Sequence, residues 1–359
     1  MAGGVTPPSV DAMASSNGIA AAAQSANGSP RRTRDIHPAA ARVWEPEPAW
    51  IPPTASVAEL TGGIAGGVFG AVTSPLIARP VLGALGALRP ANPRPLDASE
   101  MGDPGWFGPD SVAWRVHADP SLLVAGIAAF TLQALHPLAM AGVAEHSAFS
   151  DDFLGRTQRT AEFVQGVVYG STARAERLCR IVRKAHVPVV GVAPDGRPYD
   201  ANDPDLLDWV HVAEYTAIAA ANRRFALRPM SRSELDRYIA EVAIVGEGTG
   251  VLDPPQSWSG LLASLEHHRP QLAVGEYAAL GVAFLDEAPI IPGPAKPLWR
   301  AIWAGAIACL PPVGRRLLNL PMPSVAELAA CRAALRVLGS LGEPVDLAAA
   351  RRRLALAPA

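Results

Sequence analysis

A long run of uncharged, mostly apolar residues is the feature that most restricts how this chain can fold. The run extends from Leu122 to Val143 and follows Asp119-Pro120, a pair typical of a helix start, because aspartate caps the helix and proline fits its first turn. By hydropathy alone the run would pass for a membrane span. Gln133, His136 and Pro137 interrupt it, and neither flank carries a basic cluster. We therefore expect a buried central helix kinked at Pro137, with a membrane-associated helical protein that lacks a cofactor as an alternative.

The same capping chemistry predicts helices in the rest of the chain. They begin at Asp203-Pro204, at Ser231 with Glu234, and at Ser324 with Glu327, and the first two run through Arg224 and Val245. The alternation of apolar and polar residues that is typical of strands never persists for more than a few positions. The sequence therefore predicts an all-α fold.

The composition supports a large core and excludes one class of partner. Apolar residues make up 49% of the 359 residues and charged residues only 18%, so the chain can bury an extensive interior. The net charge is −2 and the lysines and arginines are scattered along the chain. A nucleic-acid partner is not expected, because polyanion binding needs a concentrated basic surface.

The ends of the chain differ in composition from its middle. Residues 1–45 are rich in Ala, Ser, Gly and Pro and are predicted to be a disordered tail. Residues 46–105 are predicted to form a proline-rich, partly helical extension. A single large multi-helix domain is expected over residues 106–345, followed by a C-terminal tail at 346–359.

Cysteine usage and the N-terminus bear on the compartment. Cys179, Cys309 and Cys331 are far apart and lack C-x-x-C spacing, which predicts buried, reduced thiols. The N-terminus carries no basic stretch followed at once by an apolar run, so a secretory signal is not expected. We expect a cytoplasmic protein, with peripheral membrane association left open; the sequence does not predict an oligomeric state.

Familiar catalytic motifs are missing from the sequence. It contains no G-x-S-x-G elbow, P-loop or H-E-x-x-H motif. The glycine-rich stretch from Gly246 to Gly250 follows a capped helix and not a strand, so we interpret it as a helix-ending turn.

A predicted helix over residues 152–170 carries unusual polar side chains beside apolar ones. Arg156, Thr160, Phe163 and Val167 follow helical spacing, and Arg159 lies next to the same face. Two interpretations stay open. The arginines extend past apolar neighbours to water on a solvated helix edge, or they form a cationic rim over a cavity.

The next predicted helix, residues 174–185, leads to a histidine. Leu178, Val182 and His186 are one turn apart each, which places His186 in line with an apolar stripe. The imidazole could donate one hydrogen bond to a backbone carbonyl, the common role of a core histidine. It could equally serve as the proximal ligand of a haem iron.

Many short blocks of the sequence occur in the same order as the conserved blocks of one protein family. The blocks are Trp106-Phe-Gly-Pro-Asp110, Trp114-Arg-Val-His117, Leu132-Gln-Ala-Leu-His-Pro137, His146-Ser147, Gly155-Arg156, Arg159-Thr160, Val168-Tyr-Gly170, Val182-Arg183, His186, Val189 to Gly191, Tyr199 to Pro204 and Leu207 to His211. Together, over about Trp106 to Gly250, they resemble the MpaB and latex-clearing protein family of haem-dependent oxygenases.

This resemblance implies a haem b enzyme with a globin-like helical core. His186 matches the proximal iron ligand, and Arg156 and Thr160 match residues of the distal pocket, with Phe163 beside the cofactor. Rubber-cleaving members carry a lysine where this chain has Arg159, a poor iron ligand because its guanidinium stays protonated. That departure, and the missing secretion signal, argue against rubber as the substrate.

The resemblance also implies a reaction class. We expect O2 or peroxide to react at the iron with a hydrophobic, unsaturated small molecule or lipid, with Arg156, Arg159 and Thr160 as the candidate catalytic residues. A haem carrier or sensor without turnover is the alternative from another class.

Other polar residues receive lesser roles. His136 is expected to be structural or part of the distal pocket, and His211 to pack or to orient another group, neither being an iron ligand. Glu145 and Asp151 are candidate bases without a secure match.

Overall fold

Helices supply nearly all the regular structure in the part of the chain that the structure describes. The computed structural model describes residues 98–146, 153–289, 291–340 and 344–355. Within these ranges the thirteen α-helices are α5 (Val112–Ala118), α6 (Ser121–Gln133), α7 (Pro137–His146), α8 (Phe153–Tyr169), α9 (Thr172–His186), α10 (Pro204–Phe225), α11 (Arg232–Thr249), α12 (Trp258–His268), α13 (Glu276–Glu287), α14 (Lys296–Cys309), α15 (Pro312–Leu317), α16 (Val325–Ser340) and α17 (Val345–Ala355). The predicted all-α class is confirmed.

A small hairpin and three short turns of 3-10 helix complete the described structure. The 3-10 turns are η1 (Ala98–Glu100), η2 (Arg269–Gln271) and η3 (Gly293–Ala295). Strands β1 (Val190–Val192) and β2 (Pro198–Asp200) pair antiparallel, with Val190 opposite Asp200. Three residues are too few to show the alternation that reveals a strand in a sequence. The predicted tail over 1–45 and the extension up to residue 97 lie outside the described residues.

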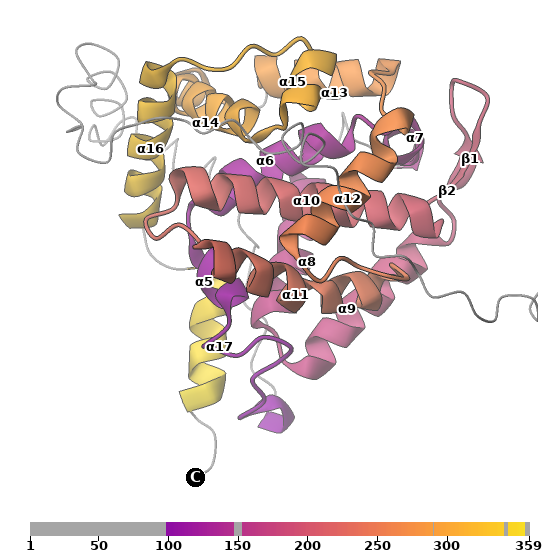
Figure 1. Cartoon of the computed structure of the whole chain (residues 1–359). Coiled ribbons are helices and arrows are strands. Elements are labelled where there is room, and N and C mark those ends of the chain that lie inside the picture. Colours follow the sequence, from indigo (N-terminus) through magenta and orange to yellow (C-terminus); the bar gives the residue numbers. More distant parts are fainter. Residues whose placement is uncertain (1–97, 147–152, 290, 341–343, 356–359) are drawn as a thin grey trace, which may run out of the picture. The chain divides into compact units, whose positions relative to one another are not determined.

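The centre of the fold is the antiparallel pair α6 and α10, which crosses the middle of the molecule (Figure 1). Both helices bury small side chains: Ala125 and Ala128 of α6 and Ala213 and Ala221 of α10 are all fully buried. Alanines allow the two helices to approach closely. Helix α14 covers α6 and in turn packs on α16, while α11 and α12 pack against α10. The predicted central helix therefore has protein on several sides.

The apolar run from Leu122 to Val143 forms two helices and not one kinked helix. Helix α6 ends at Gln133 and α7 starts at Pro137, and their axes differ by 107°. Proline has no backbone N–H, and its ring conflicts with the carbonyl four residues earlier, so it begins a new helix here. Within the described residues, no single helix is long and apolar enough to cross a membrane, and this bent pair passes only when its halves are combined.

Helices α8 and α9 form a hairpin with a tight connection at Gly170-Ser171. Ser171 caps α9 by accepting a hydrogen bond from the Arg174 backbone N–H at 3.2 Å. Arg353 of α17 stabilises the connection, because its guanidinium donates hydrogen bonds to the carbonyls of Tyr169 and Gly170 at 2.9 and 3.2 Å. Residues 346–355 were predicted as part of a tail, and this prediction is wrong because α17 packs on α8.

The predicted helix caps are confirmed, with one correction. Ser231 and Glu234 form the expected capping box, and Ser324 and Glu327 form another. Helix α11 continues past Val245 to Thr249, so only Gly250, at φ 111°, makes the predicted helix-ending turn. The earlier glycines lie inside the helix, where close neighbours leave no room for a side chain.

The three cysteines are also as predicted. Cys179, Cys309 and Cys331 are buried and form no disulfide. Burial raises the pKa of the Cys309 thiol to about 12, which keeps it protonated and unreactive.

Candidate functional site

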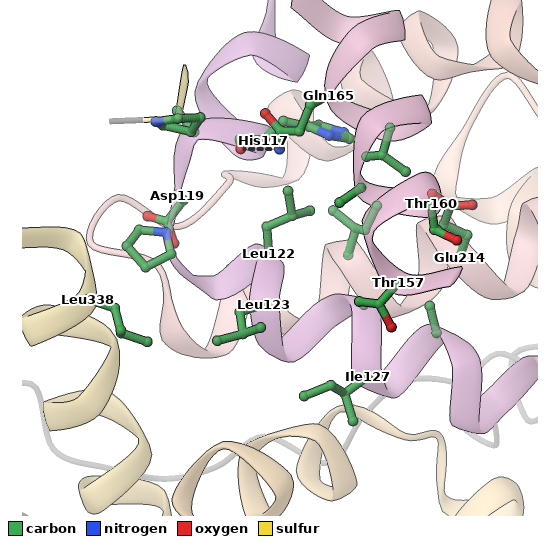
Figure 2. A pocket seen from close by; sticks show the side chains of 18 of the residues that line it. His117, Asp119, Leu122, Leu123, Ile127, Thr157, Thr160, Gln165, Glu214 and Leu338 are labelled. Carbon is green, nitrogen blue, oxygen red and sulfur yellow. Dashed lines mark hydrogen bonds between the residues drawn. The ribbon is translucent and has the colours of Figure 1, made fainter. Parts of the chain in front are cut away.

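A pocket of about 740 Å³ lies between α6, α8 and α10, and residues of α5, α13, α14, α16 and α17 also line it (Figure 2). Most of the lining is apolar. Helix α6 alone contributes Leu122, Leu123, Ile127 and Phe130. A pocket of this size and character suits a hydrophobic small molecule.

Four polar side chains of the pocket wall come from the three helices between which the pocket lies. Gln133 closes α6, Arg156 and Thr160 lie one turn apart on α8, and Glu214 comes from α10. Gln133 donates a hydrogen bond at 3.2 Å to the carbonyl of Val210, one turn before Glu214, which ties α6 to α10. Figure 2 shows Thr160 and Glu214 across the pocket from Asp119 and Leu338. We call Gln133, Arg156, Thr160 and Glu214 the polar end.

Two residues of the predicted distal face line this end. Helical spacing puts Arg156 and Thr160 on the same side of α8, and the Thr160 hydroxyl donates to the Arg156 carbonyl at 3.1 Å. Burial, aided by the nearby charge of Arg159, lowers the pKa of Arg156. The sequence left two interpretations of this helix open, and the cationic rim over a cavity fits Arg156, because this residue belongs to the pocket wall.

The other two residues predicted on this helix have different surroundings. Arg159 is exposed, and Phe163 is partly buried against the hydrophobic core. Neither lines the pocket. Arg159 therefore fits the solvated helix edge that the sequence left open for the arginines.

Glu214 was missed by the sequence interpretation. It is surrounded by buried apolar residues of α10, and burial raises the pKa of its carboxyl to about 7. The partial exposure of the side chain is toward the pocket that it lines. A single carboxylate in the apolar stretch Val212 to Ala221 was the available signal. Only the packed helices show that it faces a cavity.

A second polar group lies where α5 meets α8. His117 Nε2 is 3.0 Å from the Tyr238 hydroxyl, and the Gln165 amide donates to the His117 carbonyl at 3.4 Å. His117 Nδ1 and Gln165 Oε1 are buried and have no hydrogen-bond partner among the described residues. Burial lowers the pKa of His117 to about 4, so its imidazole is neutral at neutral pH.

His186 is the last residue of α9, at the end of the hairpin away from the Gly170-Ser171 connection. It does not line the pocket. Its Nδ1 is buried without a hydrogen-bond partner in the described part of the chain, and burial lowers its pKa despite nearby Asp200. At 1.5 Å per residue, Arg156 on α8 and His186 on α9 each lie about 20 Å from the connection. Both residues are therefore far along their helices from the connection.

The lesser candidates lie away from the pocket wall. His136 is fully buried, with Nε2 2.7 Å from Gln271 Oε1, so the side chain of Gln271 is its partner. His211 packs beside Tyr215, with ring centroids 4.7 Å apart, and burial lowers its pKa to about 4. Glu145 accepts a hydrogen bond from the Tyr199 hydroxyl at 2.7 Å. Asp151 lies outside the described residues.

Iron ligation through one imidazole is the type of metal binding that these side chains allow. The described ranges contain no group of three or more His, Cys, Asp and Glu side chains that could hold a metal ion. Haem iron needs only an axial protein ligand, because the porphyrin supplies the other nitrogens. A neutral imidazole without a hydrogen-bond partner, as at His186, fits that requirement.

The fold and the pocket define a helical protein that can enclose a hydrophobic ligand beside a buried cation. The family model for the catalytic domain of ER-bound oxygenase mpaB/B' and rubber oxygenase matches residues 114–340, more than half of the chain. The chain belongs to this oxygenase family, and it is an oxidoreductase. No curated protein and no solved structure matches it significantly. The match continues past Gly250, where the noted resemblance ended, into α16.

Proposed function

We propose that this oxygenase depends on haem b, with His186 as the axial ligand, and that it acts on a hydrophobic, unsaturated small molecule with O2 or peroxide. The proposal is supported by the apolar pocket that Arg156 and Thr160 line, together with a neutral histidine on the helix that follows. Arg156 lies in the first half of α8 and His186 ends α9, so both are far along their helices from the Gly170-Ser171 connection.

The environment of His186 supports its role as a ligand. Iron binds neutral imidazole, and the lowered pKa of His186 keeps the ring neutral at neutral pH. Its buried Nδ1 lacks a partner in the described structure, so ligation would break no hydrogen bond at that atom. Haem, when bound, would supply the redox chemistry of oxygen activation.

The chain's own residues contribute charge and an apolar environment. Arg156 remains cationic despite its lowered pKa, because the usual value is far above neutral, and it can stabilise negative charge that develops in the transition state. The Thr160 hydroxyl already donates to the Arg156 carbonyl, so its free lone pairs are available to accept a hydrogen bond. The apolar side chains of α6 exclude water from the substrate.

Features of the sequence and the pocket favour a small substrate over a rubber polymer. Arg159 replaces the lysine of rubber-cleaving relatives, and it is exposed and does not line the pocket. The volume of about 740 Å³ matches a terpenoid or a lipid of similar size.

An absorption spectrum of the purified chain tests the haem proposal. We expect a Soret band in the wild type and its loss in His186→Ala. His267→Ala is the matched control, because His267 is a partly exposed histidine at the end of α12 and should leave the band unchanged. A wild type without a Soret band after supply of haem, or an unaltered band in His186→Ala, would refute the assignment.

A further inference from the structure

The pocket has three carboxylates in its wall, and they differ in their partners. Asp119 accepts hydrogen bonds from the backbone N–H groups of Ser121 and Leu227, at 2.8 and 3.3 Å. Asp346 forms an ion pair with Arg174 at 3.3 Å. Glu214 has no hydrogen bond and no ion pair among the described residues, although it is the carboxylate at the polar end.

This difference is costly for the folded protein. A fully buried carboxyl group without a partner costs on the order of 1–3 kcal/mol, and a half-buried one such as Glu214 costs a part of that. Glu214 is half-buried, and its neighbours on α10 are buried, so we interpret its remaining exposure as directed toward the pocket that it lines. Its unmet hydrogen-bonding capacity is therefore available to a ligand in the pocket.

We infer that Glu214 binds a hydroxyl group of the substrate, so that the substrate is an unsaturated alcohol of terpenoid or lipid type and not a pure hydrocarbon. This inference rests on the proposed function, which makes the molecule in the pocket a substrate. The rest of the pocket matches such a molecule, because the apolar chain would lie along Ile127 and Phe130 of α6. Glu214 is then a substrate-binding residue that determines specificity.

The chemistry of the polar end favours a hydroxyl over a charged group. A hydroxyl both donates and accepts hydrogen bonds, so it pairs with Glu214 whether the carboxyl is protonated or ionised. A cationic ligand would meet Arg156 at the same end of the pocket. A carboxylate ligand would be repelled by ionised Glu214.

The test compares two probes with the same ten-carbon skeleton, geraniol with a hydroxyl and myrcene without one. Dissociation constants are measured by equilibrium dialysis with the full chain. Glu214→Leu should lower the preference for geraniol over myrcene at least tenfold, which corresponds to about 1.4 kcal/mol. Glu214→Gln, which keeps hydrogen-bonding capacity, should stay within about threefold of the wild type.

Glu247→Leu serves as the control, because Glu247 is an exposed glutamate of α11 and should change nothing. An unchanged preference in Glu214→Leu, or failure of the wild type to bind geraniol, overturns the inference. Dialysis measures binding without turnover. A chain without a Soret band would therefore refute the haem proposal separately.

Discussion

The buried carboxyl of Glu214 makes a quantitative prediction about stability. Its pKa is raised from the ordinary 4.5 to about 7, so between these values the folded chain binds this proton more tightly than the unfolded chain does. Stability must therefore fall as pH rises through this window. Between pH 5 and pH 8 the loss amounts to about 2.5 kcal/mol, and less where water in the pocket solvates the carboxylate. Glu214→Gln removes this loss.

Denaturant unfolding at pH 5 and pH 8 measures the effect. The stability of Glu214→Gln relative to wild type should rise by about 2–3 kcal/mol between the two pH values. Histidines whose pKa is lowered by burial, such as His117, shift stability in the opposite direction, but equally in both proteins. Glu247→Gln, at an exposed position, should show no such rise. A relative stability of Glu214→Gln that stays constant with pH would show that the carboxyl is solvated or paired, which refutes the reasoning.

Three further predictions concern catalysis, folding and membranes. Arg156→Ala should lower turnover about 100-fold or more while haem content stays unchanged, as judged by product formation and the Soret band; loss of both together would contradict its role in the reaction. Arg353→Ala should cost about 2–4 kcal/mol in denaturant unfolding, because three backbone carbonyls lose a charged donor, and an unchanged midpoint would contradict this. Val190 and Val192 are exposed on the β-hairpin, so if the chain associates peripherally with membranes, changing both to Asp should reduce sedimentation with lipid vesicles, and equal sedimentation would place the contact elsewhere.

Local signals in the sequence were enough for the helices. Ser231 and Ser324 mark helix starts through side chains that act within one turn, and both capping boxes form as predicted. Pro137 marks a break, but the angle of 107° depends on how α7 packs on its neighbours. Helix α17 was missed because its arginine-rich sequence resembles a solvated tail until Arg353 meets the carbonyls of the hairpin.

The sequence predicts which candidate site residues share one face of a helix, but not which helices meet at the pocket. Spacing on α8 predicts that Arg156 and Thr160 share a face, and both line the pocket. Glu214 lies more than fifty residues away in sequence, and no local pattern shows that α10 turns it toward that face. The position of His186 relative to the pocket likewise depends on the angle between two helices, which periodicity does not contain.

The hydrogen bonds from Arg353 to the connection between α8 and α9 affect how precisely the far ends of the two helices are positioned. Arg353 holds helices α8 and α9 where they connect, and the proposed site residues Arg156 and His186 lie about 20 Å along the two helices from that connection. A rotation of only one degree at the connection shifts such a residue by about 0.35 Å, and a misplacement of about 1 Å can cost a hundredfold in rate. Substitutions around the C-terminal helix α17 should therefore change activity by altering the angle between α8 and α9.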